Sequence, residues 1–112
     1  MRAPVHRQVD SVFGALADPT RRRVVETLAR GGTVTASGLA EQLPITRQAV
    51  AKHLTALRGA DLVTGTRVGR EMQYKLRPQP LDDAAQWIHT VSAEWDERLT
   101  SLRRSVEARR ST

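Results

Sequence analysis

One stretch of this sequence carries side chains whose types and spacing suit the recognition of DNA bases. Arginine can donate two hydrogen bonds to guanine, glutamine can bind the edge of adenine, and lysine can bind guanine or a phosphate. Small residues among them would let a helix approach the bases closely. The stretch contributes Arg47, Gln48, Ala49, Ala51, Lys52 and Thr55. Because any solvated helix has a polar face, a helix that only covers a protein core is the alternative.

The same stretch also has an apolar side. Val50, His53, Leu54 and Leu57 follow one another at i, i+3, i+4 and i+7, which predicts one buried stripe along a helix. Thr46 precedes the stripe and can cap the helix with its hydroxyl. We therefore expect a helix that starts after Thr46, with one face toward a core and the other free for a ligand.

A shorter helix is predicted just before it. Thr35 can cap this helix, and Pro44 should end it near Leu43, since proline has no amide hydrogen and disfavours helical angles in the preceding residue. Two helices joined by a tight turn predict a helix-turn-helix unit over about residues 35–58. Thr35 and Ser37, at its start, are included among the predicted DNA-binding residues.

A β-hairpin is predicted after this unit, over residues 63–77. Residues 64–66 and 72–76 have the composition of strands, and the second of them alternates apolar with polar side chains. Gly69 supplies the turn and lies between Arg67 and Arg70. We expect these two arginines to contact the DNA backbone or the minor groove. An ordinary exposed hairpin is the alternative.

Two helices are predicted before the helix-turn-helix unit. The first runs from about Asp10 to Ala17, and the second, capped by Asp18, runs to Ala29 and ends at two glycines. Three consecutive arginines, residues 21–23, span roughly 200° of the second helix. They cannot all face one ligand, so we interpret them as a solvated basic face from which one arginine could reach a phosphate.

A long helix is predicted from Leu81 to about Ala108, within the segment 81–109 and after the prolines at 78 and 80. Its apolar residues recur at steps of three and four and form a stripe about 42 Å long. A domain of this size cannot cover such a stripe, so we expect a second copy to cover it, with the first helix alongside. A purely intramolecular helix is the alternative. The predicted dimer interface consists of Val9, Val12, Phe13, Leu16, Ile88, Val91, Trp95, Leu99 and Leu102.

The composition predicts one domain covering residues 1–112. Its net charge is +6, and the excess lies in residues 1–80, which have 13 basic and 6 acidic side chains, against 5 and 6 in residues 81–112. Such a charge favours a nucleic acid or an acidic surface as partner. The sequence has no apolar run long enough for a membrane span and no signal-peptide core, so we expect a cytoplasmic protein with no membrane partner.

The sequence gives little support for a metal site, a cofactor or enzymatic activity. The chain has no cysteine, and its three histidines are His6, His53 and His89. His53 lies at the edge of a buried stripe, where histidine more often packs or hydrogen-bonds than binds a metal. No serine has the setting of a nucleophile elbow, and no glycine loop could hold a phosphate. We expect no metal site, no cofactor, no catalytic residue and no enzymatic activity.

Three blocks of the chain, in order, resemble the ArsR/SmtB family of winged helix-turn-helix transcriptional repressors. They are FGALADPTRRRVVETLARGG, the unit ending QAVAKHLTALRGADLV, and TRVGREMQYKL. The tail WDERLTSLRRSVE is similar to the C-terminal dimerisation helix of a subgroup without metal sites. The resemblance implies a mainly α fold with a small β-hairpin, and a homodimer held through the N- and C-terminal helices. It further implies a recognition helix that starts at Thr46 and a wing around Gly69.

The resemblance also implies a function: sequence-specific regulation of transcription, by a repressor that binds an inverted repeat in double-stranded DNA. It argues against metal sensing, because metal-responsive members have a cysteine pair where this chain has residues 36–38, or a spacing of Asp and His that Asp82, Asp83 and His89 do not match. Two alternatives stay open. One is a sensor repressor with a pocket for an unknown effector at the dimer interface, and the other is a winged helix used for protein contacts.

Overall fold

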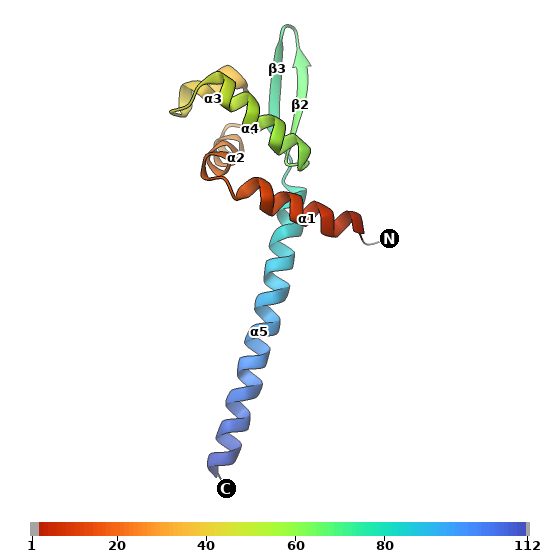
Figure 1. Cartoon of the computed structure of the whole chain (residues 1–112), viewed down its shortest axis with the longest axis vertical. Helices are drawn as coiled ribbons and strands as arrows, with labels where there is room; N and C mark the ends of the chain where they lie inside the picture. Colours follow the sequence, from red (N-terminus) through yellow and green to blue (C-terminus); the bar gives the residue numbers. More distant parts are fainter. Residues whose placement is uncertain (1–2, 112) are drawn as a thin grey trace.

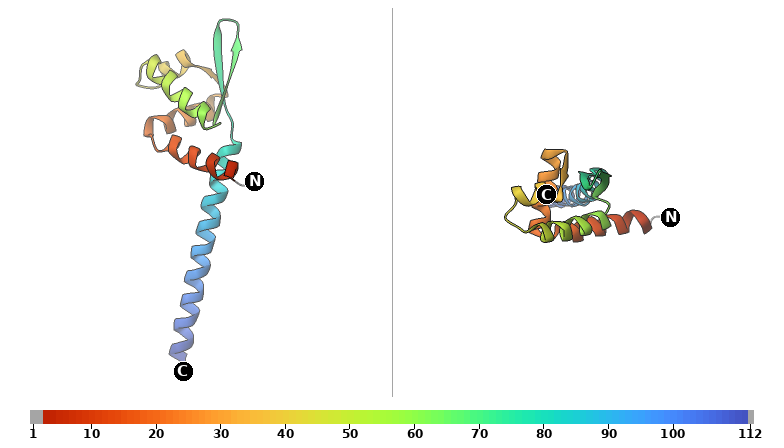
Figure 2. Two further views of the ribbon diagram at one scale, coloured as in Figure 1. Left: turned by 45° about the vertical axis from the view of Figure 1, so that its right-hand side comes forward. Right: turned by 90° about the horizontal axis from the view of Figure 1, so that it is seen from above.

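The computed structural model describes the backbone of residues 3–111 and the side chains of residues 8–110. The first four helices and the strands form a body, from which the fifth helix projects as a long rod, and the described chain measures 76 × 36 × 19 Å (Figure 1). This helix leaves the body on the side opposite to the tip of the hairpin (Figure 2). The elements are α1 (Ala3–Leu16), α2 (Pro19–Gly31), β1 (Thr33–Thr35), α3 (Ala36–Gln42), α4 (Arg47–Gly59), β2 (Val63–Val68), β3 (Glu71–Leu76) and α5 (Gln79–Ser111).

The core forms where α4 packs against the other helices. Val50, Leu54 and Leu57 of α4 are 0–1% exposed, as the predicted stripe requires. They belong to one cluster with buried residues of every other element of the body except β1 and β3. Leu28 of α2 and Leu39 of α3 are equally buried. The prediction of a helix-turn-helix unit on a mainly α core is therefore confirmed.

The three strands form an antiparallel sheet in the order β1-β3-β2. The hairpin register pairs Val63 with Leu76 and Val68 with Glu71, and Gly69 makes the turn at φ +63°. This confirms the predicted hairpin, which is longer on its first strand than expected. β1 was not predicted, because three residues give no alternation to detect; it forms by pairing with β3, Val34 opposite Tyr74.

The two terminal helices are longer than predicted. α1 begins at Ala3 rather than near Asp10, and α5 begins at Gln79 rather than Leu81 and continues to Ser111. Each of these helices has a proline in its first turn, which was expected to lie outside the helix. Proline is tolerated there, since its missing amide hydrogen would have no partner within the helix. No helix among residues 3–111 is both long and apolar enough to cross a membrane.

Two residues of the predicted dimer interface lie in the core of the single chain. Val9 and Val12 of α1 are 7% and 0% exposed within one chain, so their side chains present no surface to a partner. Phe13 and Leu16 are only partly buried and lie at the border of the core. α1 thus uses its most apolar stripe to complete the chain's own core, because the short helices of the body would otherwise leave that core open.

Three of the helices begin with the N-cap residues that the sequence predicted. The Asp18 carboxylate accepts hydrogen bonds from the amides of Thr20 (2.8 Å) and Arg21 (3.2 Å) at the start of α2. Thr35 accepts from the amide of Gly38 (3.0 Å), and Thr46 accepts from the amide of Ala49 (3.1 Å). These bonds satisfy amides that the first turn of a helix leaves unpaired.

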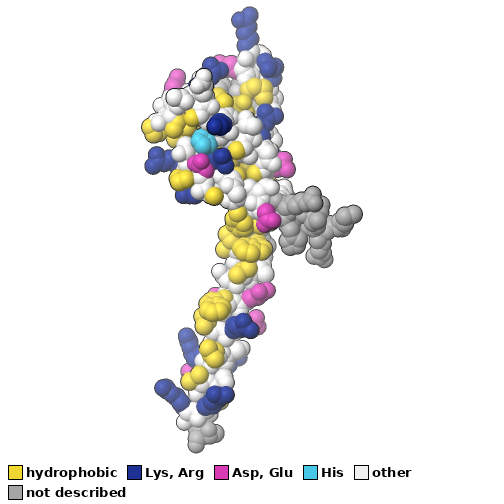
Figure 3. All heavy atoms as spheres, viewed as in Figure 1, with side chains coloured by type: hydrophobic (Ala, Val, Ile, Leu, Met, Phe, Trp, Pro, Cys, Tyr) yellow, Lys and Arg dark blue, Asp and Glu magenta, His cyan; other side chains and the backbone are white. Residues whose placement is uncertain are grey.

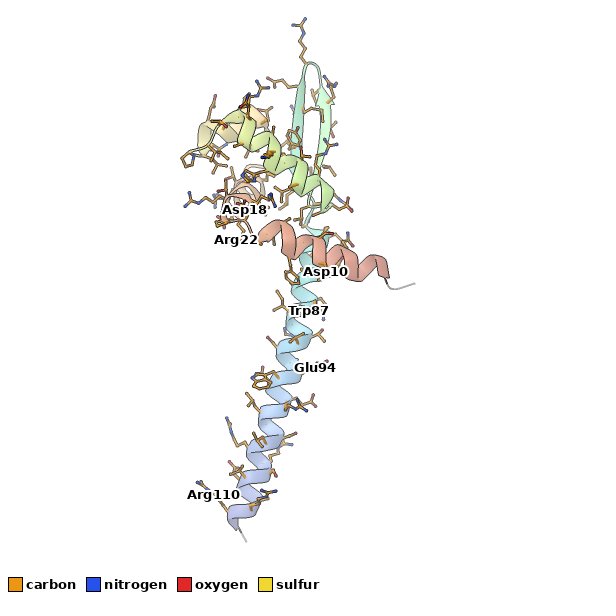
Figure 4. The ribbon with its side chains drawn as sticks, viewed as in Figure 1. Asp10, Asp18, Arg22, Trp87, Glu94 and Arg110 are labelled. Carbon is orange, nitrogen blue, oxygen red and sulfur yellow. The ribbon has the colours of Figure 1, made fainter. Side chains whose placement is uncertain are left out.

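The hydrogen bond from the Arg21 amide is the largest cause that lowers the pKa of Asp18; the Thr20 amide and the charges of His53 and Arg21 act in the same direction, against desolvation. A carboxyl with a lowered pKa adds stability that is present above its unfolded pKa, near 4, and that is lost as pH falls through its folded pKa. Asp18→Ala should therefore reduce the urea midpoint at pH 7 and have less effect below pH 4. Asp10→Ala, an exposed carboxylate on α1 that caps no helix (Figure 4), is the control. An equal loss of midpoint for Asp18→Ala at pH 7 and pH 3 would contradict a role for the charged carboxylate.

Candidate nucleic-acid interface

The face of α4 opposite to the core is open to solvent. Arg47, Gln48, Ala51 and Lys52 are exposed, as a base-reading face requires. Thr55 is exposed too, but its hydroxyl donates to the carbonyl oxygen of Ala51 (3.0 Å), so only its lone pairs remain for a ligand.

Ala49, which was expected on the same face, is only partly exposed and lies at its edge. The cap bond that its amide makes to Thr46 holds the first turn of α4 in place.

A cleft of about 240 Å³ lies between this face, the start of α3 and the second strand of the hairpin. It brings together residues from three segments that are separate in the sequence. Five of the lining residues were predicted to bind DNA. Its walls are Thr35, Ala36, Ser37, Arg47, Ala51, Arg70, Glu71, Met72 and Tyr74. Four of these, Ala36, Glu71, Met72 and Tyr74, were not predicted, since only the folding of β3 against α3 and α4 places them there.

The polar groups of the cleft suit a phosphate. Arg47 and Arg70 bring two guanidinium groups against the one carboxylate of Glu71, so the cleft is positive on balance. The Ser37 side chain is exposed, and the Thr35 hydroxyl accepts the Gly38 amide while its own hydrogen stays free to be donated. Arginine and hydroxyl donors are the groups that most often bind DNA phosphates.

The hairpin presents Arg67 on the same side as the cleft. Arg67 pairs directly with Met72, and directly opposed residues of an antiparallel pair share one face of the sheet. Since Met72 lines the cleft, Arg67 extends the basic surface from the cleft toward the tip. A basic side chain projects from the tip of the hairpin (Figure 3), and Arg70 is the basic residue between the two strands.

Arg58 is a further cation near this surface that was not predicted from the sequence. A Cβ on Gly65 would lie 2.9 Å from Met72 Cε and 3.4 Å from Arg58 Nη1, so the missing side chain of Gly65 makes room for both. Arg58 follows Arg47 by eleven residues, or about three helical turns, and therefore projects from the same side of α4. That spacing is the signal that could have identified it.

The three consecutive arginines of α2 diverge, as expected. Arg21 Nε donates to Nδ1 of His53 on α4 (3.3 Å), and Arg22 donates to the carbonyl oxygen of Leu16 (2.6 Å), while Arg23 is exposed. His53 is thus a hydrogen-bonding residue that links α4 to α2. No group of three or more His, Cys, Asp and Glu within the described part of the chain could hold a metal ion. His6 lies outside the residues whose side chains are described.

A second surface of interest is the apolar stripe of α5. Trp87 packs edge-on against Phe13 of α1, with ring centroids 5.5 Å apart and an interplanar angle of 67°. Beyond this contact, hydrophobic side chains continue in a row along the rod, open to solvent (Figure 3). The exposed members are Trp87, Ile88, Val91, Trp95, Leu99, Leu102 and Val106.

Comparison with known proteins agrees with this geometry. A family model described as a helix-turn-helix domain matches residues 16–66, which include α2, α3 and α4. The transcriptional repressor SdpR of Bacillus subtilis is 34% identical over 80 residues, covering 71% of this chain and 88% of SdpR. The structure of an ArsR-like transcriptional regulator from Rhodococcus sp. RHA1 superposes with a TM-score of 0.78 at 40% identity, covering 88% of this chain and 92% of that one. The chain belongs to the ArsR/SmtB family.

As a member of the ArsR/SmtB family, the protein is a DNA-binding transcriptional regulator with a winged helix-turn-helix fold, not an enzyme. Another solved structure with the same fold is a homodimeric winged helix-turn-helix domain, Mb0332 from Mycobacterium bovis, a possible ArsR-family regulator. It has a TM-score of 0.63 at 26% identity and covers 88% of this chain and 87% of its own.

Arg70→Ala removes one cation from the cleft. We expect it to weaken binding to any DNA sequence and to reduce the slope of log K against log salt by about one unit for each phosphate that the protein no longer neutralises. Fluorescence anisotropy at several salt concentrations measures this slope. Arg104→Ala is the matched control, since it removes the same charge from an exposed site on the rod. An unchanged slope for Arg70→Ala would exclude a phosphate contact by Arg70.

Proposed function

We propose that the protein is a homodimeric repressor that binds an inverted repeat in double-stranded DNA. In this proposal α4 of each protomer enters a major groove, and the cleft and the hairpin hold the phosphates beside it. The observation that supports it most directly is the cleft, which joins Arg47 and Arg70 beside the exposed face of α4. Repression is proposed because the similar SdpR is named a transcriptional repressor.

The proposal divides the predicted DNA-binding residues by role. Gln48, Ala51 and Lys52 face away from the core and are assigned to base edges. Thr35, Ser37 and Arg70 line the cleft and are assigned to phosphates, with Arg67 on the hairpin beside them. Arg47 belongs to both the face of α4 and the cleft, so it is assigned to the boundary between the major groove and the backbone.

The homodimer is supported by the exposed stripe of α5, because a row of large apolar side chains in water is unfavourable unless a partner covers it. The homodimeric Mb0332 domain has the same fold. Within the single unit 1–112 we assign residues 35–58 to the helix-turn-helix, 63–77 to the wing and 81–109 to dimerisation. Two α4 helices related by a dyad meet successive major grooves when half-site centres lie ~10–11 bp apart.

Gln48→Ala tests base recognition. It should weaken operator binding by ~1–3 kcal/mol for each bidentate hydrogen-bonded pair that it removes, while affinity for random DNA changes little. Competition titrations of operator against random DNA measure the ratio. Gln86→Ala, an exposed glutamine on α5, should leave both affinities unchanged. If Gln48→Ala binds the operator as tightly as wild type, Gln48 does not recognise a base.

Leu99→Asp tests the dimer. It places a charge in the centre of the proposed apolar contact, and burial of an unpaired charge costs several kcal/mol, so the variant should sediment as a monomer at micromolar concentration. Thr100→Asp adds the same charge to the next residue, on the other side of α5, and should remain a dimer. A dimeric Leu99→Asp variant would contradict the assignment of this stripe.

A further inference from the structure

The cleft contains the one sulfur atom among the side chains of residues 8–110. The sequence has two methionines and no cysteine, and Met1 lies outside the described residues. Met72 of β3 is half-buried and lines the cleft together with Arg47 and Arg70. Since both arginines of the cleft wall are exposed, a small molecule dissolved in water can reach the thioether from the open side. No base or phosphate contact is assigned to Met72 in the proposed function.

Gly65 determines where the end of the Met72 side chain lies. Gly65 and Met72 are on neighbouring strands and on the same face of the hairpin, since Gly65 pairs with Tyr74, two residues after Met72. A Cβ on Gly65 would lie 2.9 Å from Met72 Cε and 3.2 Å from Tyr74 Cε1, so both side chains converge over the glycine backbone. The sulfur, which is bonded to Cε, is therefore held close to the hairpin, where the side chain has little room to turn.

A thioether is oxidised by a peroxide through transfer of one oxygen atom. The sulfur attacks one oxygen of hydrogen peroxide, and a sulfur–oxygen bond forms as the oxygen–oxygen bond breaks. The proton of the transferred oxygen passes to the departing hydroxide, which leaves as water. The sulfur loses two electrons and the peroxide gains them, so no further reactant is needed. The product, methionine sulfoxide, is polar where methionine is apolar, and methionine sulfoxide reductases convert it back.

An oxygen added at this position competes with a phosphate. A sulfoxide oxygen accepts hydrogen bonds, and the cleft supplies the guanidinium donors of Arg47 and Arg70, which the proposed function assigns to DNA. The room beside Gly65 is already filled by the methionine methyl and the tyrosine ring. The new oxygen must therefore point into the cleft or push the side chain into it. In both cases it occupies part of the 240 Å³ that a DNA phosphate would enter.

We propose that Met72 is a site of reversible oxidation by peroxides, and that the sulfoxide weakens the binding of the cleft to DNA. The inference rests on the proposed function and adds a chemical signal that acts on the same cleft. No thiol competes for the oxidant, because the chain has no cysteine. Met1 is the one other thioether of the sequence, and its oxidation serves as an internal measure of the peroxide dose.

Peroxide treatment followed by DNA titration tests the proposal. Hydrogen peroxide is the oxidant, and the probe is a DNA duplex of random sequence, since the cleft is assigned to phosphates and not to bases. Mass spectrometry of proteolytic fragments should locate one added oxygen on Met72. Fluorescence anisotropy should show an affinity about tenfold lower, the equivalent of one lost hydrogen bond to a charged group. Methionine sulfoxide reductases for both sulfoxide epimers, with their reductant, should restore the affinity.

Met72→Leu is the matched control, because leucine is apolar, similar in volume and free of sulfur. Each protein is compared with itself before and after treatment. The affinity of Met72→Leu should not change on treatment, although Met1 is oxidised in it as in the wild type. Circular dichroism of the oxidised wild type should retain the helical signal of the untreated chain.

Several outcomes would overturn the inference. If Met72 stays unmodified while Met1 is oxidised, it is not a reactive site. An unchanged affinity with Met72 oxidised would show that the sulfoxide has no effect on the cleft. An equal loss of affinity in Met72→Leu would assign the effect to another residue, and a lost helical signal would assign it to unfolding. A wild-type chain that binds no DNA before treatment would instead overturn the proposed function itself, and with it the inference.

Discussion

The structure depends on the burial of one side of α4. Val50, Leu54 and Leu57 are almost completely removed from water, and burial of three such side chains is worth several kcal/mol at roughly 1.5–3 kcal/mol each. A helix packed this tightly along one side cannot rotate, so its other side faces outward. The Thr46 cap fixes where the helix starts, and the Arg21–His53 hydrogen bond links its middle to α2. The direction of Gln48 and Lys52 follows from these constraints.

The short sheet positions the hairpin against that helix. β1 connects α2 to α3 and pairs with β3, so the start of α3 and the second strand of the hairpin are held side by side. The cleft forms between them. It is positively charged because folding brings Arg47 and Arg70 to the same cleft. In the proposed function, this frame holds phosphates at a fixed distance from the exposed face of α4, and this distance sets the register of the protein on the duplex.

The DNA-binding body and the rod are joined where β3 leads into α5, in addition to the packing of α1 against the base of α5. The Arg77 amide donates to the Leu62 carbonyl oxygen (2.8 Å) where β3 leads into α5. The Arg77 and Asp61 side chains form an ion pair at 3.9 Å, but both are well exposed, so it adds little stability. Asp61 has φ +59°, a left-handed backbone conformation that lets α4 turn sharply into β2. Through this junction, whatever holds two rods together also sets the separation and orientation of the two α4 helices.

The sequence by itself determined the features that depend on neighbouring residues. The stripe of α4, the caps at Asp18, Thr35 and Thr46, and the turn at Gly69 each rest on signals within one or two helical turns or a single β-turn, and all of them are present. The helix-turn-helix and the hairpin could therefore be predicted, as could most residues of the candidate site.

Only the tertiary structure decided what depends on distant segments. It paired β1 with β3, closed the cleft around Arg47 and Arg70, and added Met72 and Tyr74 to its walls. It also assigned Val12 to the core of one chain rather than to a dimer contact. An apolar stripe shows that a side chain must be buried but not by which partner, because the pattern is the same whether the cover comes from the same chain or from another.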